Sequence, residues 1–209
     1  MSYVEFIGTV FYLGSVWLIA KRNILTWPVG IISVLLYMAL FYQIRLYSDT
    51  LEQVYYLGAS IYGWWIWYRS PRENGLISDV VYSNINKLIV WALVTFIVSL
   101  PVGWLMARVH VFLPSIFPDE ASFPFLDALT TVMSFSAMWL MARKKVESWV
   151  YWIVVDVVGI WLYFAKDVKF ISLLYVVLFV MAINGLRMWH KSMQDALSED
   201  RILKANILN

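Results

Sequence analysis

The chain has 209 residues, of which 62% are hydrophobic, 18% are aromatic and 14% are charged. Soluble domains contain about 45–50% apolar and about 25% charged residues, so the few charged residues here cannot coat a soluble surface and a membrane is the expected environment. The scattered net charge of +2 excludes a nucleic-acid-binding surface, and the absence of cysteine excludes disulfides, thiol nucleophiles and thiolate metal sites.

Charged or proline-containing breaks divide the chain into apolar pieces of the length that crosses a bilayer. A hydrocarbon core of about 30 Å needs about 20 helical residues. Seven such pieces are found, so the sequence predicts an all-α membrane protein with seven transmembrane helices. The predicted spans are 3–20, 27–44, 51–69, 87–107, 124–142, 149–166 and 170–189.

Basic residues are distributed unequally between the two sides of this arrangement. Short loops rich in Lys and Arg normally stay in the cytoplasm, so the basic side is expected to be cytoplasmic. This places the N-terminus outside and the C-terminus inside. One side holds Lys21, Arg22, Arg69, Arg72, Lys87, Arg143, Lys144, Lys145, Arg187, Lys191, Arg201 and Lys204, and the other holds Arg45, Arg108, Lys166 and Lys169.

The chain also contains an internal repeat. A shift of 122 residues aligns 5–69 with 127–191 without a gap, and 13 of the 65 positions are identical. Identities of tryptophan at one fixed offset are hard to obtain by chance. They are Trp17/Trp139, Trp27/Trp149 and Trp67/Trp189.

Each repeat holds three predicted spans, and the remaining fourth span inverts the chain once more between them. The two triple-helix repeats are therefore expected to be parallel, in a 3+1+3 layout like that of SWEETs. The predicted organisation is a first repeat at 3–69, a linker with the lone fourth helix at 70–123, a second repeat at 124–190 and a cytoplasmic tail at 191–209. A duplicated structural membrane protein without a pathway is the alternative.

Polar groups inside a span are costly, so they are candidates for function. On the third span Gln53, Tyr56, Ser60 and Trp64 follow helical spacing, and on the sixth Trp152 and Asp156 do the same. Aromatic faces with a carboxylate suit a flat heteroaromatic cation, and Asp156 is the expected counter-charge. The alternative is that Asp156 pairs with an indole or stays protonated between helices.

Four further residues of the spans have a less specific signal. Asn184 is a candidate for a sugar hydroxyl, although it lies about half a helical turn from the Tyr175 face, so both cannot point into one pocket. Tryptophans at the span ends fit membrane-belt anchors. They include Trp27, Trp149 and Trp189.

Each repeat carries a series of short motifs. In the first repeat they are Trp27-Pro28 with Gly30, Phe41-Tyr42-Gln43-Ile44, Leu46-Tyr47, Leu51, Gln53-Val54, Ile61-Tyr62-Gly63-Trp64 and Trp67, and in the second repeat they are Phe123-Pro124-Phe125, Asp127, Ala142-Arg143-Lys144, Glu147, Trp149, Trp152, Asn184-Gly185 and Arg187-Met188-Trp189. Together these motifs resemble the PnuC-type vitamin transporters over nearly the whole chain. The chain departs from the pattern of many nicotinamide riboside members at Ser33, Ser60 and Asp156, where they carry asparagine.

The resemblance implies a carrier in a bacterial inner membrane that imports nicotinamide riboside by facilitated diffusion, with trapping by intracellular phosphorylation. Thiamine or riboflavin transport by the same fold remains an alternative, as does a non-transporting structural or receptor-like protein. No glycine loop for phosphates, paired metal ligands or nucleophile with a base is present in the sequence. We therefore expect no enzyme activity, cofactor or metal. The expected partners are a vitamin substrate and the lipid bilayer, and a homo-oligomer is left open as an alternative to a monomer.

Overall fold

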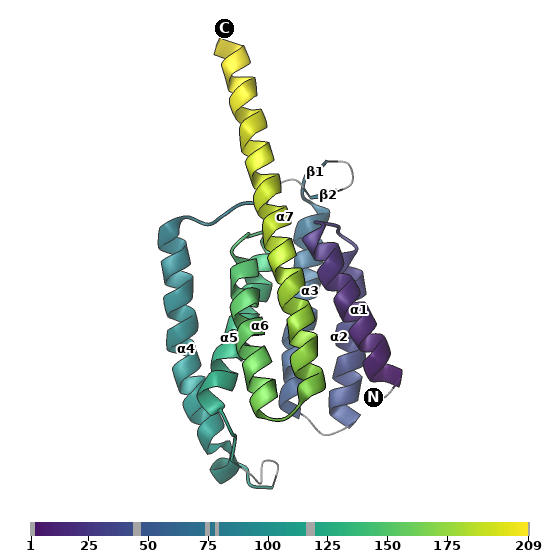
Figure 1. Ribbon diagram of the computed structural model, residues 1–209, viewed down its shortest axis with the longest axis vertical. Coiled ribbons are helices and arrows are strands. Elements are labelled where there is room, and N and C mark those ends of the chain that lie inside the picture. Colours follow the sequence, from purple (N-terminus) through teal and green to yellow (C-terminus); the bar gives the residue numbers. More distant parts are fainter. Residues whose placement is uncertain (1–2, 44–46, 74–75, 78–79, 116–119, 209) are drawn as a thin grey trace.

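The computed structural model describes residues 3–43, 47–73, 76–77, 80–115 and 120–208, which form seven helices in one bundle (Figure 1). The helices are α1 (Tyr3–Ala20), α2 (Thr26–Gln43), α3 (Tyr47–Tyr68), α4 (Ile85–Phe112), α5 (Pro124–Ala142), α6 (Ser148–Ala165) and α7 (Lys169–Leu208). The predicted all-α architecture is confirmed, and the end of the bundle from which α7 projects is called the upper face below (Figure 1).

Three elements differ from the predicted ones. The linker after α3 contains a short antiparallel pair, β1 (Arg72–Glu73) and β2 (Leu76–Ile77), where the sequence predicted no strand. Helix α4 reaches Phe112, beyond the predicted end at residue 107. Helix α7 continues through the predicted tail to Leu208 as one helix of 40 residues, because no proline or glycine interrupts it after Gly185.

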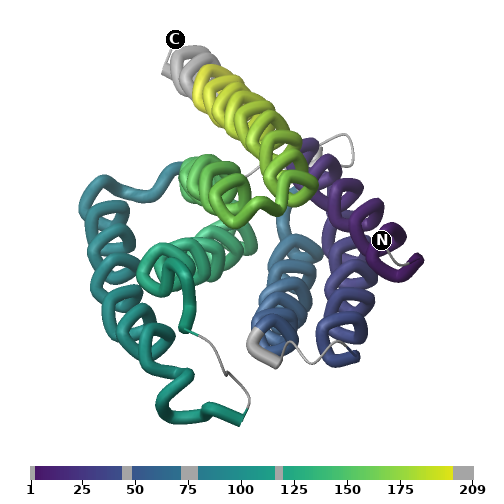
Figure 2. The backbone as a smooth tube through the Cα atoms, turned by 60° about the horizontal axis from the view of Figure 1, so that its bottom comes forward, coloured from purple at the N-terminus to yellow at the C-terminus, as the bar shows by residue number. Residues whose placement is uncertain are grey.

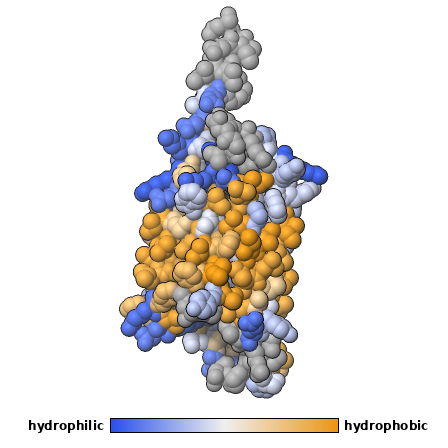
Figure 3. Space-filling model, turned by 90° about the vertical axis from the view of Figure 1, so that its right-hand side faces the viewer, coloured by the Kyte–Doolittle hydropathy of each residue, from blue (hydrophilic) through white to orange (hydrophobic). Residues whose placement is uncertain are grey.

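On the face that Figure 3 shows, an apolar belt crosses the bundle, with hydrophilic side chains above and below it. Six of the described helices are long and apolar enough to cross a membrane. Helix α3 is not among them, because its first half carries Asp49, Glu52 and Gln53. It nevertheless packs against α2 and α5 inside the bundle. An environment of lipid explains the belt, since large apolar side chains there have no protein neighbour to cover them.

The helices pack as two chain-consecutive groups with a fourth helix at the side. Helix α1 packs on α2 and α2 on α3, while α5 packs on α6 and α6 on α7. The groups meet where α3 contacts α5 and α1 contacts α7. Helix α4 lies at one edge of the bundle beside α5 (Figure 2). Gly103 and the hydrogen bond of 3.0 Å between Thr95 Oγ1 and Ser136 Oγ allow this close packing.

Local geometry recurs at the offset of 122 residues. Two residues beyond the end of each of the helices α1 and α5 lies a residue in the left-handed region, Arg22 with φ 58° and Lys144 with φ 61°. In each turn the next backbone N–H donates five residues back, from Asn23 to Leu18 and from Lys145 to Leu140. Such bonds satisfy the last carbonyls of a helix and redirect the chain. The two repeats therefore use the same turn to place α2 and α6.

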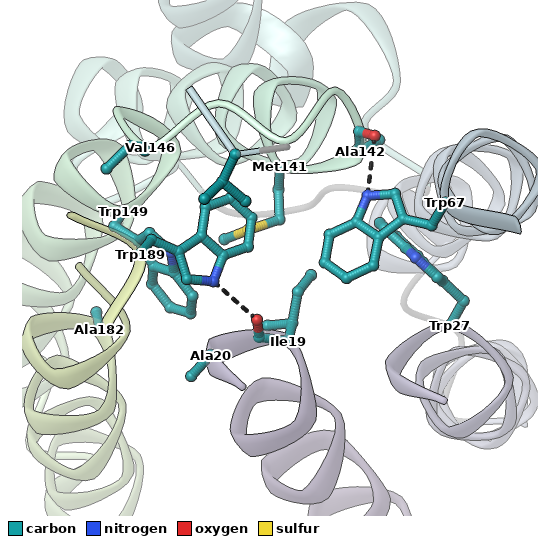
Figure 4. Packing of buried hydrophobic residues seen from close by; sticks show 11 residues of the cluster. Ile19, Ala20, Trp27, Trp67, Met141, Ala142, Val146, Trp149, Ala182 and Trp189 are labelled. Atoms are coloured by element: carbon teal, nitrogen blue, oxygen red, sulfur yellow. Dashed lines mark hydrogen bonds between the residues drawn. The ribbon is translucent and has the colours of Figure 1, made fainter. Parts of the chain in front are cut away.

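The core lies near the upper face and is built around four tryptophans (Figure 4). Trp27 meets Trp67 edge to face with ring centroids 5.3 Å apart, and Trp149 meets Trp189 in the same way at 5.7 Å. All four are at most 2% exposed. The interpretation of Trp27, Trp149 and Trp189 as membrane-belt anchors is therefore wrong. Periodicity alone does not distinguish an indole at a membrane interface from one buried between helices.

Two tryptophan hydrogen bonds connect the repeats in both directions. The indole N–H of Trp67 donates to the Ala142 carbonyl at 3.1 Å, and that of Trp189 donates to the Ile19 carbonyl at 3.0 Å (Figure 4). Each acceptor is at the end of the first helix of the other repeat. The core therefore joins the two three-helix groups at the upper face.

Candidate functional site

A buried carboxylate lies midway along α6. Asp156 is 2% exposed, and among the residues that the structure describes none donates a hydrogen bond to it or forms an ion pair with it. A charge placed inside a membrane bundle without a partner is costly. Such a group is retained where a ligand supplies the partner, so Asp156 is the natural centre of a candidate site.

Tyrosines from two other helices lie within electrostatic range of this carboxylate. Tyr12 of α1 and Tyr175 of α7 interact electrostatically with Asp156, and Tyr56 of α3 interacts in the same way with both tyrosines. Tyr56 also interacts with Ser134 of α5. We name Tyr12, Tyr56, Asp156 and Tyr175 the central cluster. It draws on both repeats and lies below the tryptophan core, near the middle of the bundle.

The structure brings some of the predicted site residues together. Tyr56 and Asp156 both belong to the central cluster. Gln53 is half-buried one turn before Tyr56, and Ser60 is buried one turn after it. Trp152, one turn before Asp156, packs against the tryptophan core. These residues form a polar and aromatic stripe that leads away from Asp156 along α3 and α6.

Two predicted residues lie elsewhere. Trp64 is 41% exposed and lines an open groove of about 340 Å³ on the outside of α3 with Ile61, Trp65 and Tyr68. Asn184 is also exposed, on the outer side of α7. Helical geometry explains both positions: Trp64 is one residue from the buried Gly63, and Asn184 precedes the buried Gly185, whose face points to the core. Neither is part of the central cluster.

Sequence reasoning missed Tyr12 and Tyr175, and the internal repeat does not single them out. Residues that build the scaffold recur at the offset of 122, as Trp27/Trp149 and Trp67/Trp189 do. The central cluster does not recur, because its four positions correspond to Ser134 for Tyr12, Leu178 for Tyr56, Val34 for Asp156 and Gln53 for Tyr175. Most aligned positions differ, so this divergence does not by itself mark a site, but it means that the cluster is not built symmetrically from the two repeats.

Charged and polar groups continue from the cluster toward the lower face. Tyr163 stacks on Tyr175 with ring centroids 5.3 Å apart and interacts with Asp127 and Glu52. Glu52 accepts a hydrogen bond of 3.1 Å from Thr131 Oγ1, so α3 and α5 are connected there. Acidic groups therefore lie between the lower face and Asp156.

The chemistry of this interior suits an aromatic cation. Aromatic faces attract a positive ring with about 0.5–2 kcal/mol per contact, and a carboxylate adds direct charge pairing. Among the described residues, no Lys or Arg pairs with Asp156, and no three His, Cys, Asp or Glu residues are grouped as metal ligands. An anionic phosphate beside Asp156 would be repelled.

Comparisons with known proteins agree with this geometry. A family model described as "Nicotinamide mononucleotide transporter" matches residues 2–191. The nicotinamide riboside transporter PnuC of Escherichia coli (strain K12) is 32% identical over 213 residues, covering 93% of this chain and 88% of the relative. The riboflavin/roseoflavin transporter RibM of Streptomyces davaonensis is 27% identical over 187 residues, covering 88% and 83%.

A solved structure has a similar fold. The crystal structure of the vitamin B3 transporter PnuC superposes with a TM-score of 0.71 at 21% sequence identity, covering 93% of this chain and 83% of that one. The likeness at this identity concerns the fold. It shows that the arrangement of the helices is one that a transporter uses.

Proposed function

The chain belongs to the nicotinamide mononucleotide transporter family, and from that premise we propose that it imports nicotinamide riboside across a bacterial inner membrane by facilitated diffusion. Phosphorylation inside the cell would trap the riboside by converting it into an anion. The observation that carries the proposal is Asp156, a buried carboxylate without a described partner near Tyr12 and Tyr175. Many nicotinamide riboside members carry asparagine at this position, so in this chain the side chain offers a negative charge in addition to the oxygen that an asparagine amide offers. A pyridinium ring supplies the missing positive charge.

The buried carboxylate of Asp156 also distinguishes the riboside from two other ligands that the comparisons name, the mononucleotide and riboflavin. The mononucleotide carries a phosphate, and a second negative charge beside Asp156 is unfavourable in a low-dielectric interior. The isoalloxazine ring of riboflavin is uncharged, so it gains nothing from the carboxylate. Thiamine is also an aromatic cation, and it is the ligand against which the riboside has to be compared.

Transport by purified protein tests the proposal. We expect proteoliposomes to equilibrate labelled nicotinamide riboside to equal concentrations on both sides without a proton or sodium gradient, and to exclude the mononucleotide. Thiamine and riboflavin are the competitors to include. Accumulation above the outside concentration in response to an imposed ion gradient would refute facilitated diffusion, and uptake of thiamine alone would refute the riboside as substrate.

We further propose the 3+1+3 layout, with repeats at 3–69 and 124–190, the lone helix α4 in the linker at 70–123 and a cytoplasmic tail at 191–209. The matched turns at Arg22 and Lys144 support it, as do the reciprocal bonds of Trp67 and Trp189. The lone helix makes the repeats parallel, so the first turn of each lies on the same side of the membrane. Both of these turns are basic, which supports a cytoplasmic upper face.

Reporter fusions test this orientation. With the N-terminus outside and the C-terminus inside, a reporter that works only in the cytoplasm should be active after Asn209 and inactive when inserted beside Asp119. A phosphatase that works only outside the cytoplasm should give the opposite result at both positions. Activity of the cytoplasmic reporter beside Asp119 would contradict both the orientation and the parallel repeats.

A further inference from the structure

A glycine in α6 allows an aromatic ring to lie directly on the helix backbone. A Cβ atom added to Gly159 would lie 2.5 Å from Cδ1 and Cε1 of Tyr175 and 2.9 Å from its Cγ. Real Cβ contacts are not that short, so any side chain at position 159 would displace the ring. Glycine is therefore needed at position 159 so that the Tyr175 ring can approach the backbone of α6 closely. It is not needed there for a special backbone conformation, because Gly159 lies inside a regular helix.

This contact fixes the Tyr175 ring beside the buried carboxylate. Gly159 follows Asp156 by one helical turn, so both lie on the same face of α6. The ring of Tyr175 also stacks on Tyr163, with an interplanar angle of 20°. A ring held against the backbone of α6 and against a second ring cannot move aside without breaking one of the two contacts.

The Gly159–Tyr175 contact differs from two similar contacts in the chain. Gly63 accommodates the Trp27 ring and Gly185 accommodates the Trp149 ring, and these two pairs recur at the offset of 122 because they build the shared core. The counterparts of Gly159 and Tyr175 in the first repeat are Tyr37 and Gln53. The scaffold of a repeat therefore does not require this contact, which lies in the asymmetric part of the interior.

Resting on the proposed function, we infer that Gly159 and Tyr175 together determine the size of the ring that the carrier accepts. The phenol of Tyr175 is the wall opposite the substrate ring, and Gly159 sets how far this wall is withdrawn toward α6. The resulting space accepts a single six-membered ring and excludes a fused three-ring system such as isoalloxazine. Tyr175 is a specificity-determining residue, and Gly159 is a positioning residue that acts through it.

Binding of two ligands to purified variants tests this inference. The ligands are nicotinamide riboside and riboflavin, and the readout is the ratio of their dissociation constants. Tyr175→Ala removes the wall, so it should shift the ratio toward riboflavin by about tenfold or more, the size of a packing change in an apolar pocket. Tyr175→Phe keeps the ring and should leave the ratio unchanged. Tyr175→Leu serves if the alanine variant does not fold.

Substitution of Gly159 tests the same inference from the other side of the contact. Gly159→Ala should weaken riboside binding by about tenfold, because the displaced ring enters the ligand's space. The double variant with Tyr175→Ala should recover the ratio of Tyr175→Ala alone, since no ring is left to displace. Gly58→Ala is the matched control, because a Cβ there has no neighbour within 4 Å. It should bind both ligands as the unaltered protein does.

Two failures are distinguishable. If the unaltered protein binds the riboside but Tyr175→Ala leaves the ratio of dissociation constants unchanged, the size-selecting role is refuted and the proposed function stands. The role is also refuted if Gly159→Ala binds the riboside normally. If the unaltered protein does not bind the riboside, the proposed function and the inference both fail.

Discussion

Replacing Asp156 with asparagine is expected to weaken binding of nicotinamide riboside by about ten- to a hundredfold, because about 1–3 kcal/mol is typical of a contact that a full charge assists. The amide keeps the size and polarity of the side chain, so the packing of the buried position is retained. The expected loss is that of the attraction between carboxylate and pyridinium. Isothermal titration of both proteins in detergent measures it.

A neutral ligand isolates the electrostatic part of this effect. The reduced riboside, whose dihydropyridine ring carries no charge, has nearly the same shape and should bind both proteins with similar affinity. Glu147→Gln is the matched control variant. It also converts a buried acid into an amide, but Glu147 is the N-cap residue of α6 at the upper face, where both of its carboxylate oxygens accept from the Ser83 backbone N–H at 3.2 Å.

These comparisons decide whether Asp156 contacts the ligand. Equal losses for the charged and the neutral ring on Asp156→Asn would make Asp156 a structural residue. Unchanged affinity for the charged ring would exclude Asp156 from the site altogether. If Glu147→Gln still binds the charged riboside more tightly than the reduced one, and Asp156→Asn no longer does, the cation is recognised in the middle of α6.

The features that sequence reasoning predicted best depend on hydrophobic length and on the repeat. Seven helices follow from the spacing of charged breaks, and six of those described are long and apolar enough to cross a membrane. The corresponding turns at Arg22 and Lys144 lie at the predicted offset. The β1–β2 pair was not predicted, because two-residue strands have no detectable period. The continuation of α7 was missed because a polar segment after a span resembles a tail.

The candidate site was only partly predictable, for a geometric reason. Periodicity identifies which residues of one helix share a face, but it does not tell whether this face meets another helix or lipid. Tyr56 and Trp64 belong to the same predicted stripe of α3, yet only Tyr56 reaches the central cluster. Tyr12 has only the small hydroxyl residues Thr9 and Ser15 at helical spacing, which did not single it out, and its role emerges from the approach of α1 to α7.

The second large effect is expected in the core, where glycines receive the tryptophan rings. A Cβ at Gly185 would lie 2.5 Å from Cη2 and Cζ2 of Trp149, and a Cβ at Gly63 would overlap the same part of Trp27. Both indoles are buried and each packs edge to face on a second tryptophan. Overpacking of this kind costs about 1–3 kcal/mol, so Gly63→Ala and Gly185→Ala should each lower the free energy of unfolding by that amount.

Thermal unfolding of the purified protein in detergent, followed by tryptophan fluorescence, measures this loss. Gly58→Ala is again the control, since it adds the same methyl group to α3 in open space and removes the same backbone freedom from the unfolded chain. The rings of Trp67 and Trp189 lie 6.0 Å apart, so the two perturbed sites share neighbours and their effects should not add in the double variant. If both core variants unfold at the temperature of Gly58→Ala, the rings have room to move, and the core is not the rigid joint between the repeats that its reciprocal hydrogen bonds indicate.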